Sequence, residues 1–235
     1  MRIAVVGDGR MGAAVRAEAL ARGHEVPVTL GRRGNDGGAG ITTARFAEVA
    51  VALEFTRPDA APRNVARLLE LGVPVVTGTT GWDDELPRLQ ELARERGGAL
   101  LHAANFSIGV QLLLRAAREL ARWSARSDFD AAIVERHHRA KRDAPSGTAL
   151  LLQRTVRRAD PGREYPVTSI RQGHDPGSHA VRWDAPHETL TLAHEVRDRS
   201  VFAVGAVRAA EWLAQRRGVF TFEDVLFGTT EQEAS

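Results

Sequence analysis

The side chains best suited to chemistry lie in one short segment, residues 135–149, which reads ERHHRAKRDAPSGTA. It holds two adjacent histidines, His137 and His138, and a lysine, Lys141, four residues after the first of them. An imidazole titrates near neutral pH and can donate a proton, and an ammonium group supplies a compact positive charge. The segment therefore predicts a site that protonates and holds an anionic substrate.

The end of the same segment predicts a helix start that can bind an anion. Ser146 or Thr148 can cap the helix, and Pro145 makes the chain enter it in an extended conformation. The free N–H groups around Gly147 and Thr148 then point outward, where they stabilise a negative charge. We expect a carboxylate of the substrate at this position.

Lys141 is also unusual in its residue type. Of the 32 Lys plus Arg residues in the chain, it is the single lysine. Because an arginine is a broad planar fork and a lysine a compact donor, this bias indicates that position 141 needs an ammonium group. The alternatives are chance retention of the lysine, solvent-facing positions for His137 and Lys141, and metal binding by the histidine pair. No further His, Asp or Glu has the local spacing of a metal site, so we expect no metal.

A second motif lies at the beginning of the chain, where residues 7–12 read GDGRMG between a predicted strand over 2–6 and a predicted helix over 13–22. In such a motif Gly7 allows the tight turn, Gly9 lets the backbone approach a pyrophosphate, and Gly12 lets helix and strand pack closely. With a strand over 24–30, these elements predict a βαβ unit that binds a dinucleotide. A purely structural glycine turn is the alternative.

The residues after the second strand bear on the choice of cofactor. They read Leu30-Gly31-Arg32-Arg33, without the acid that would bind the ribose hydroxyls of NAD. Arg32 and Arg33 can pair with a 2′-phosphate, which favours NADPH or at least tolerates it. A solvated basic loop is the alternative. Further along, Gly78-Thr79-Thr80-Gly81 follows an apolar strand and could admit the nicotinamide ring, or be a loop and nothing more.

The elements between and after these motifs predict an α/β fold of two parts. Strand-like and helical segments alternate at first, which is typical of a Rossmann-type, doubly wound parallel sheet. The alternating segments are 51–55, 60–71, 73–77, 83–96 and 99–102. After a helix over 107–124 come strands without regular intervening helices, which predict an inserted α+β domain with a mixed sheet. They are 131–135, 167–171, 179–183 and 188–194, with a helix over 148–156.

We therefore expect a dinucleotide-binding domain over 1–107, a substrate-binding and oligomerisation domain over 108–199, and a segment over 200–235 that returns to the first. A helix over 201–215 begins this last segment, and 220–227 follow it. The segment 31–40 carries five glycines and predicts a flexible loop, and 34–40 and 229–235 are expected to be weakly ordered.

Composition excludes several classes of protein. The chain is 43% hydrophobic and 26% charged with a formal net charge of +2, and its charges are spread without a basic block, so we expect no nucleic-acid partner. It has no Cys and hence no disulfide framework. It shows no signal peptide and no apolar run near the roughly 18 residues of a membrane span, so we expect a cytoplasmic protein.

The segment 135–149 matches the pattern E-x-H-H-x-x-K-x-D-A-P-S-G-T-A at every fixed position. Also similar are Gly78 to Gly81, Ala104 to Gly109 (ANFSIG) and Gly205 to Leu213 (GAVRAAEWL). By these motifs, which recur in order over nearly the whole chain, the sequence resembles the dihydrodipicolinate reductase family.

The resemblance implies reduction of 4-hydroxy-tetrahydrodipicolinate, a small dicarboxylate, to tetrahydrodipicolinate with NADPH or NADH, in the diaminopimelate route to lysine. It also implies a homotetramer formed through the second domain. His137 would be the proton donor and Lys141 a second donor that holds the substrate. The substrate carboxylates would be bound by His138, Ser146, Gly147 and Thr148. The cofactor would be lined by Gly7, Asp8, Gly9, Arg10, Met11, Gly12, Arg32, Gly78, Thr79, Thr80, Ala103, Ala104, Asn105 and Phe106.

Some positions depart from the family pattern. Many relatives have one more residue in the glycine loop, which leaves the contacts of Asp8 and Arg10 open. Family members often have His-x-Ala-x-x-Arg where this chain reads HEVRDR from His194. Two other functions share parts of these motifs: an aspartate-type dehydrogenase, which would not need the His-His and Lys segment, and a redox sensor that binds NAD(P)H without turnover.

Overall fold

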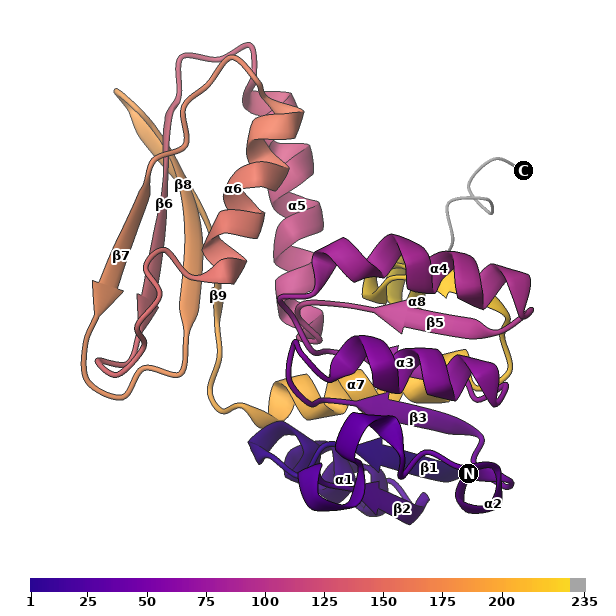
Figure 1. Cartoon of the computed structure of the whole chain (residues 1–235). Coiled ribbons are helices and arrows are strands. Elements are labelled where there is room, and N and C mark those ends of the chain that lie inside the picture. The colour runs from indigo at the N-terminus through magenta and orange to yellow at the C-terminus, as the bar shows by residue number, and fades with distance from the viewer. Residues whose placement is uncertain (229–235) are drawn as a thin grey trace. The chain divides into compact units, whose positions relative to one another are not determined.

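A computed structural model describes residues 1–228. The segment 229–235, predicted to be weakly ordered, lies outside the described residues. The chain divides into two compact units (Figure 1). The first unit contains Met1–Ser107 together with the chain from Ser200, and the second unit contains Ile108–Arg199.

The first unit is built on a six-stranded sheet in the order β10-β5-β4-β3-β1-β2, in which every pair of neighbours is parallel. The strands are β1 (Arg2–Val6), β2 (Glu25–Leu30), β3 (Val51–Glu54), β4 (Val75–Thr77), β5 (Ala99–His102) and β10 (Gly218–Phe220). The central strands are almost wholly apolar, as expected of parallel strands that are buried on both faces. The predicted doubly wound sheet is confirmed.

Helices cover both faces of this sheet. Helices α3 (Ala61–Glu70) and α4 (Leu86–Glu95) pack together, and α1 (Arg10–Ala21) packs with α7 (Ser200–Leu213) on the other face (Figure 1). The shorter helices are α2 (Thr43–Phe46) and α8 (Phe222–Phe227). Side chains alternate across each strand, so Ala4 and Val6 of β1 face the core under α3 and α4 while Ile3 and Val5 face the opposite side.

Two predictions about the first unit need correction. Helix α1 begins at Arg10, three residues before the predicted start, because Gly9 already takes the extended conformation of an N-cap. The predicted flexible loop over 31–40 forms two 3₁₀ turns, Arg32–Gly34 and Asp36–Gly38. The side chain of Asn35 holds them in place, because it accepts a hydrogen bond from the Gly40 N–H at 3.1 Å.

The second unit has a four-stranded mixed sheet in the order β7-β6-β8-β9, which confirms the predicted mixed sheet. Strands β6 and β7 are parallel, and the other neighbours are antiparallel. The strands are β6 (Asp130–His137), β7 (Val167–Arg171), β8 (Ser178–Ala185) and β9 (Glu188–Glu195). Helices α5 (Ile108–Ser124) and α6 (Gly147–Ala159) pack together over one face, around a core that includes Ile133, Leu152 and Trp183.

Strand β6 is longer than predicted and ends at His137, so this histidine lies in the sheet and not in the loop after it. Its side chain consequently points to the same face as those of Glu135 and Ile133, toward the interior. Among the described residues, no helix is both long and apolar enough to cross a membrane.

Candidate active site

The glycine loop of the first unit can hold a pyrophosphate only because its glycines carry no side chains. Gly7 has a φ of +124°, and a Cβ on it would lie 2.1 Å from the carbonyl oxygen of Phe55. A Cβ on Gly12 would lie 1.9 Å from the carbonyl oxygen of Gly7. Helix α1 starts directly after this loop, and within residues 1–228 no side chain caps it. Its first N–H groups are therefore available to a phosphate.

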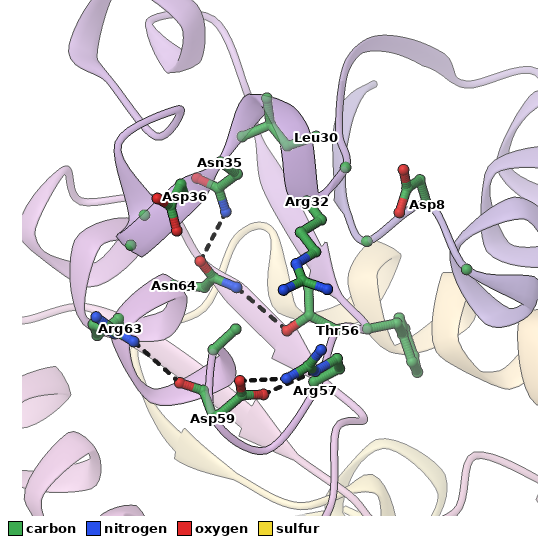
Figure 2. A pocket seen from close by; sticks show the side chains of 17 residues that line it. Asp8, Leu30, Arg32, Asn35, Asp36, Thr56, Arg57, Asp59, Arg63 and Asn64 are labelled. Carbon is green, nitrogen blue, oxygen red and sulfur yellow. Dashed lines mark hydrogen bonds and ion pairs between the residues drawn. The ribbon is translucent and has the colours of Figure 1, made fainter.

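A cavity of about 360 Å³ opens beside this loop, a size that suits a small-molecule ligand (Figure 2). Of the residues predicted to contact a cofactor, its lining includes Gly7, Asp8, Gly9 and Arg32. The other lining residues are Leu30, Gly31, Asn35, Asp36, Gly37, Gly38, Phe55, Thr56, Arg57, Asp59, Ala60, Arg63 and Asn64. Apolar side chains, amides and arginines, which can contact a nucleotide, face the cavity together with the acids Asp8, Asp36 and Asp59.

Three arginines, Arg32, Arg57 and Arg63, are among the residues that line this cavity. Arg57 donates two hydrogen bonds to the carboxylate of Asp59, at 3.0 and 2.5 Å, which lowers the pKa of that acid. Arg63 donates to the main-chain oxygen of Asp59 at 3.5 Å (Figure 2). Arg33, which the sequence pairs with Arg32, is exposed and is absent from the lining as far as the described residues go. Of these three arginines the sequence singled out Arg32 and not Arg57 or Arg63.

The remaining predicted cofactor residues lie outside this cavity as the described chain defines it. They are Arg10, Met11, Gly12, Gly78, Thr79, Thr80, Ala103, Ala104, Asn105 and Phe106. Gly78 and Thr79 follow β4, and the rings of Phe55 and Phe106 meet edge to face at 5.8 Å beside them. A Cβ on Gly78 would lie 2.1 Å from the Phe55 ring. These segments therefore form a tightly packed rim at the carboxyl ends of β3, β4 and β5.

A buried acid that the sequence reasoning missed supports this rim. Glu54, the last residue of β3, is fully buried and accepts hydrogen bonds from the hydroxyls of Thr56 and Thr77, the latter at 2.7 Å. Burial raises its pKa, which these donors partly offset. Asn64 links the group to the turns after β2, since its oxygen accepts from Asn35 at 2.8 Å (Figure 2). A glutamate inside the apolar run VALEF was the available signal.

In the second unit, the strands bring four polar residues together. Glu135 and His137 lie two residues apart on β6, on its buried face. The register pairs His137 with Arg171 of β7 and Glu135 with His179 of β8. The carboxylate of Glu135 contacts Nδ1 of His137 and accepts a hydrogen bond from Nη2 of Arg171 at 2.7 Å. The rings of His137 and His179 meet edge to face at 5.2 Å.

The surroundings of this cluster shift the pKa values of its members by different amounts. Burial opposes the charge of Glu135, but hydrogen bonds from Arg171 and His137 outweigh it and lower its pKa to about 2. Burial also lowers the pKa of His137, and Glu135 partly offsets that effect. The pKa of His179 falls to about 4, first through burial and then through repulsion from His137. At neutral pH Glu135 is therefore ionised and His179 is neutral.

Lys141 lies in the loop after β6, and Nζ donates to both carboxylate oxygens of Asp143, at 2.7 and 2.8 Å. The Lys141 side chain is 24% exposed and that of Asp143 58% exposed. The ammonium group thus has an ionic partner on its solvent side. Arg171 holds the same loop, because it donates to the main-chain oxygen of Asp143 at 2.6 Å.

The start of α6 has the predicted form. Ser146 is the N-cap, and its hydroxyl accepts the Ala149 N–H at 3.2 Å, so Ser146 and not Thr148 caps the helix. Its hydroxyl is also hydrogen-bonded to Nε2 of His179 at 3.1 Å. Gly147 is exposed and Thr148 half-buried, in the first turn of the helix. The positive end of the helix dipole at this first turn suits a carboxylate.

The donor atoms of Glu135, His137 and His179 lie within 4.8 Å of one another, a set that could hold a metal ion. Arg171 already neutralises the carboxylate of Glu135, so a cation would enter beside a guanidinium. That this site binds no metal remains a prediction. Neither Arg171 nor His179 could be found from local spacing, because they lie 34 and 42 residues after His137 in the chain.

The comparisons with known proteins agree over both units. Residues 1–106 match the family "Dihydrodipicolinate reductase, N-terminus" and residues 109–226 match "Dihydrodipicolinate reductase, C-terminus". The chain is 33% identical to the 4-hydroxy-tetrahydrodipicolinate reductase of Christiangramia forsetii, covering 96% of this chain and 98% of that protein. It is 38% identical to the enzyme of the same name from Natronomonas pharaonis, covering 96% and 100%.

A solved structure has the same fold. The dipicolinate-bound dihydrodipicolinate reductase from Paenisporosarcina sp. TG-14 aligns with a TM-score of 0.82 at 21% identity, over 96% of this chain and 99% of that one. The motif resemblance, the two-part fold and the sequence matches lead to one conclusion. The chain belongs to the dihydrodipicolinate reductase family.

Proposed function

We propose that this protein reduces 4-hydroxy-tetrahydrodipicolinate to tetrahydrodipicolinate with NADH or NADPH, in the diaminopimelate route to lysine. The observation that carries the proposal is the arrangement of residues 135–149. A buried histidine, an ammonium group and the start of α6 lie within one loop and the two elements that it joins. The related enzymes bear the name of the activity. Such a biosynthetic enzyme without Cys belongs in the cytoplasm.

The chemistry divides between the two units. When bound, the reduced nicotinamide supplies a hydride to a carbon of the unsaturated ring. The ring hydroxyl leaves as water together with a hydrogen from a neighbouring ring carbon, which forms a C=C bond, and the hydride and a proton from His137 then saturate that bond. Lys141 holds and polarises the substrate, which carries two carboxylates. His138, Ser146, Gly147 and Thr148 bind those carboxylates, through an imidazole and the start of α6.

In the first unit, Gly7, Gly9 and Gly12 bring the backbone close to the cofactor pyrophosphate, as the absent side chains allow. Asp8, Arg10 and Met11 accompany them in the loop and in the first turn of α1. The nicotinamide side of the cofactor lies at the rim formed by Gly78, Thr79 and Thr80 with Ala103, Ala104, Asn105 and Phe106.

A steady-state assay tests this proposal. The purified protein is mixed with NADPH or NADH and with freshly generated 4-hydroxy-tetrahydrodipicolinate, and the absorbance of the reduced nicotinamide is followed. We expect absorbance to fall only when that substrate is present. Oxaloacetate with ammonium serves as the substrate arm for an aspartate-type dehydrogenase. Turnover in that arm alone, or cofactor binding without turnover in either arm, would replace the proposal with one of its two rivals.

The arginines of the cavity predict the basis of cofactor choice. Arg32 lines the cavity and can pair with a 2′-phosphate, whereas its neighbour Arg33 lies outside the lining given by the described residues. We expect Arg32→Ala to lower the NADPH to NADH ratio of kcat/KM about 10-fold, since a hydrogen bond to a charged group contributes about 1.5–3 kcal/mol. The control Arg33→Ala should leave the ratio within about 2-fold of the parent. Equal ratios in all three proteins would remove Arg32 from cofactor selection.

The outer face of the second sheet predicts self-association. Within residues 108–199 both helices lie on the other face, so Val134, Ile170 and Ala180 meet solvent in a single protomer. A sheet face with apolar residues and no covering helix is typical of an interface, and we propose a homotetramer formed through it. Light scattering should give four copies for the parent protein. Val134→Glu should give smaller species, and Leu20→Glu, at an exposed leucine of α1, should not. A monomeric parent protein would overturn the proposed interface.

A further inference from the structure

We infer that Glu135 is a positioning residue for the proton donor His137, and that Arg171 anchors Glu135 for this task. The inference deepens the proposed function, on which it rests. Its basis is that the two carboxylate oxygens of Glu135 have separate partners. Oε2 contacts Nδ1 of His137, and Oε1 accepts from Arg171 at 2.7 Å and from the Ser146 N–H at 3.3 Å.

The carboxylate is held rigidly. Glu135 is fully buried and lies on β6, which is paired with β7 on one side and β8 on the other. Arg171 is fixed in turn, because its guanidinium donates to the main-chain oxygens of Ile170 at 2.9 Å and Asp143 at 2.6 Å. The orientation of the carboxylate is thus determined by β6, β7 and the loop that carries Lys141. Rotation of the His137 ring would cost the hydrogen bond to Nδ1.

This arrangement decides which ring nitrogen handles the proton. An ionised carboxylate only accepts hydrogen bonds, so Nδ1 of His137 carries its hydrogen in both protonation states. Nε2 is then the nitrogen that gains and loses the catalytic proton. Nε2 lies beside Gly177, where a Cβ would come within 2.9 Å of it. Gly177 has a φ of +138°, which also favours glycine. A side chain at position 177 would therefore collide with Nε2.

The charges around His137 explain why a carboxylate is needed. Lys141 and Arg171 both oppose a positive charge on the ring, and burial does so more strongly. The neighbouring His179 is neutral and hydrogen-bonded to Ser146, and it repels the charged ring when it is itself protonated. Glu135 stabilises the imidazolium against these groups. Without Glu135 the pKa of His137 would be lower still, and the ring would lose its proton at a lower pH.

The alternative is that Glu135 and Arg171 form an ion pair with a purely structural role. The two roles differ in one observable property. A positioning residue sets the pH at which His137 loses its proton, whereas a structural pair affects the amount and stability of active protein. Because an imidazolium donor is active below its pKa, loss of the carboxylate should move the alkaline limb of the activity profile to lower pH.

The first experiment measures pH profiles of kcat and kcat/KM for Glu135→Gln. Glutamine keeps the size of the side chain and can still accept one hydrogen bond, so we expect kcat to fall on the order of 10²-fold, less than the ~10⁴ seen when an orienting carboxylate is lost from a catalytic triad. The KM for reduced cofactor should stay within about 2-fold of the parent, a smaller factor than one ordinary hydrogen bond contributes. The alkaline limb should move down by a pH unit or more. The control Glu195→Gln removes an exposed carboxylate of β9. It should leave kcat, the KM for reduced cofactor and the alkaline limb unchanged. A smaller kcat with an unmoved limb would overturn the inference.

The second experiment needs no variant and no turnover. Nitrogen-15 NMR of histidine-labelled parent protein reports which ring nitrogen of His137 carries hydrogen in the neutral form. We expect hydrogen on Nδ1, and hydrogen on Nε2 would overturn the inference even if Glu135→Gln failed to fold. This result is independent of the substrate. If NMR shows hydrogen on Nδ1 but the steady-state assay shows no turnover, the result counts against the proposed function. If the assay shows turnover but NMR shows hydrogen on Nε2, the result counts against the role of Glu135 alone.

Discussion

Lys141→Ala should lower kcat/KM on the order of 10²-fold or more, since one well-placed donor is worth about 10²–10³. The ammonium group is the single lysine of the chain and lies in the loop directly after His137. Its loss should leave the melting temperature nearly unchanged, because the partner Asp143 is 58% exposed and such ion pairs contribute about 0–1 kcal/mol. Binding of reduced cofactor, measured by fluorescence, should also be unchanged.

Lys141→Arg is the sharper variant. It keeps the positive charge and can still form an ion pair with Asp143, but it replaces a compact donor with a planar guanidinium group. We expect it to be nearly as impaired as Lys141→Ala. Arg142→Ala, at the exposed cation next in the chain, is the matched control and should keep the parent kcat/KM. Full activity in Lys141→Arg would show that any cation suffices and that the lysine was retained by chance.

His137→Gln should lower kcat about 10²–10⁴-fold, the range that a general acid contributes. The residual activity should lose the alkaline limb of its pH profile, because the group that titrates there is gone. His138→Gln should behave differently, with its main effect on the KM for the dicarboxylate, since His138 is proposed to bind and not to protonate. Stopped-flow and steady-state measurements on the two variants separate these effects. The opposite pattern, a kcat defect in His138→Gln and a KM defect in His137→Gln, would exchange the two roles.

Sequence reasoning found the elements of the fold well because their signals are local. The runs RIAVV and VALE are apolar on both faces, and the sequence therefore predicted β1 and β3 within one or two residues. The two 3₁₀ turns in the loop after β2 were not predicted, for a related reason. Their order depends on Asn35, whose amide reaches Asn64 of α3, 29 residues later. A contact of that span leaves no periodic pattern in the sequence.

The residues of the candidate site also differ in whether their signal in the sequence is local or depends on distant residues. His137, His138, Lys141 and the α6 start were visible because they lie within one motif. Arg171 and His179 were not, since they join Glu135 only through the register of β7 and β8 on β6. Arg57 likewise reaches the cavity of Arg32 from a different strand end. The residues that adjust the charge of the site thus come from strand pairing, and the residues proposed to touch the substrate come from one stretch of chain.

The most direct measurement follows the transferred hydrogen. The protein is given 4-hydroxy-tetrahydrodipicolinate and reduced cofactor that carries deuterium at both hydrogen positions of C4 of the nicotinamide, and the product is analysed by mass spectrometry. The account predicts tetrahydrodipicolinate with one deuterium per molecule on a ring carbon, in equal amount to the oxidised cofactor formed and to the substrate consumed. Product without deuterium, or oxidised cofactor without tetrahydrodipicolinate, would contradict it.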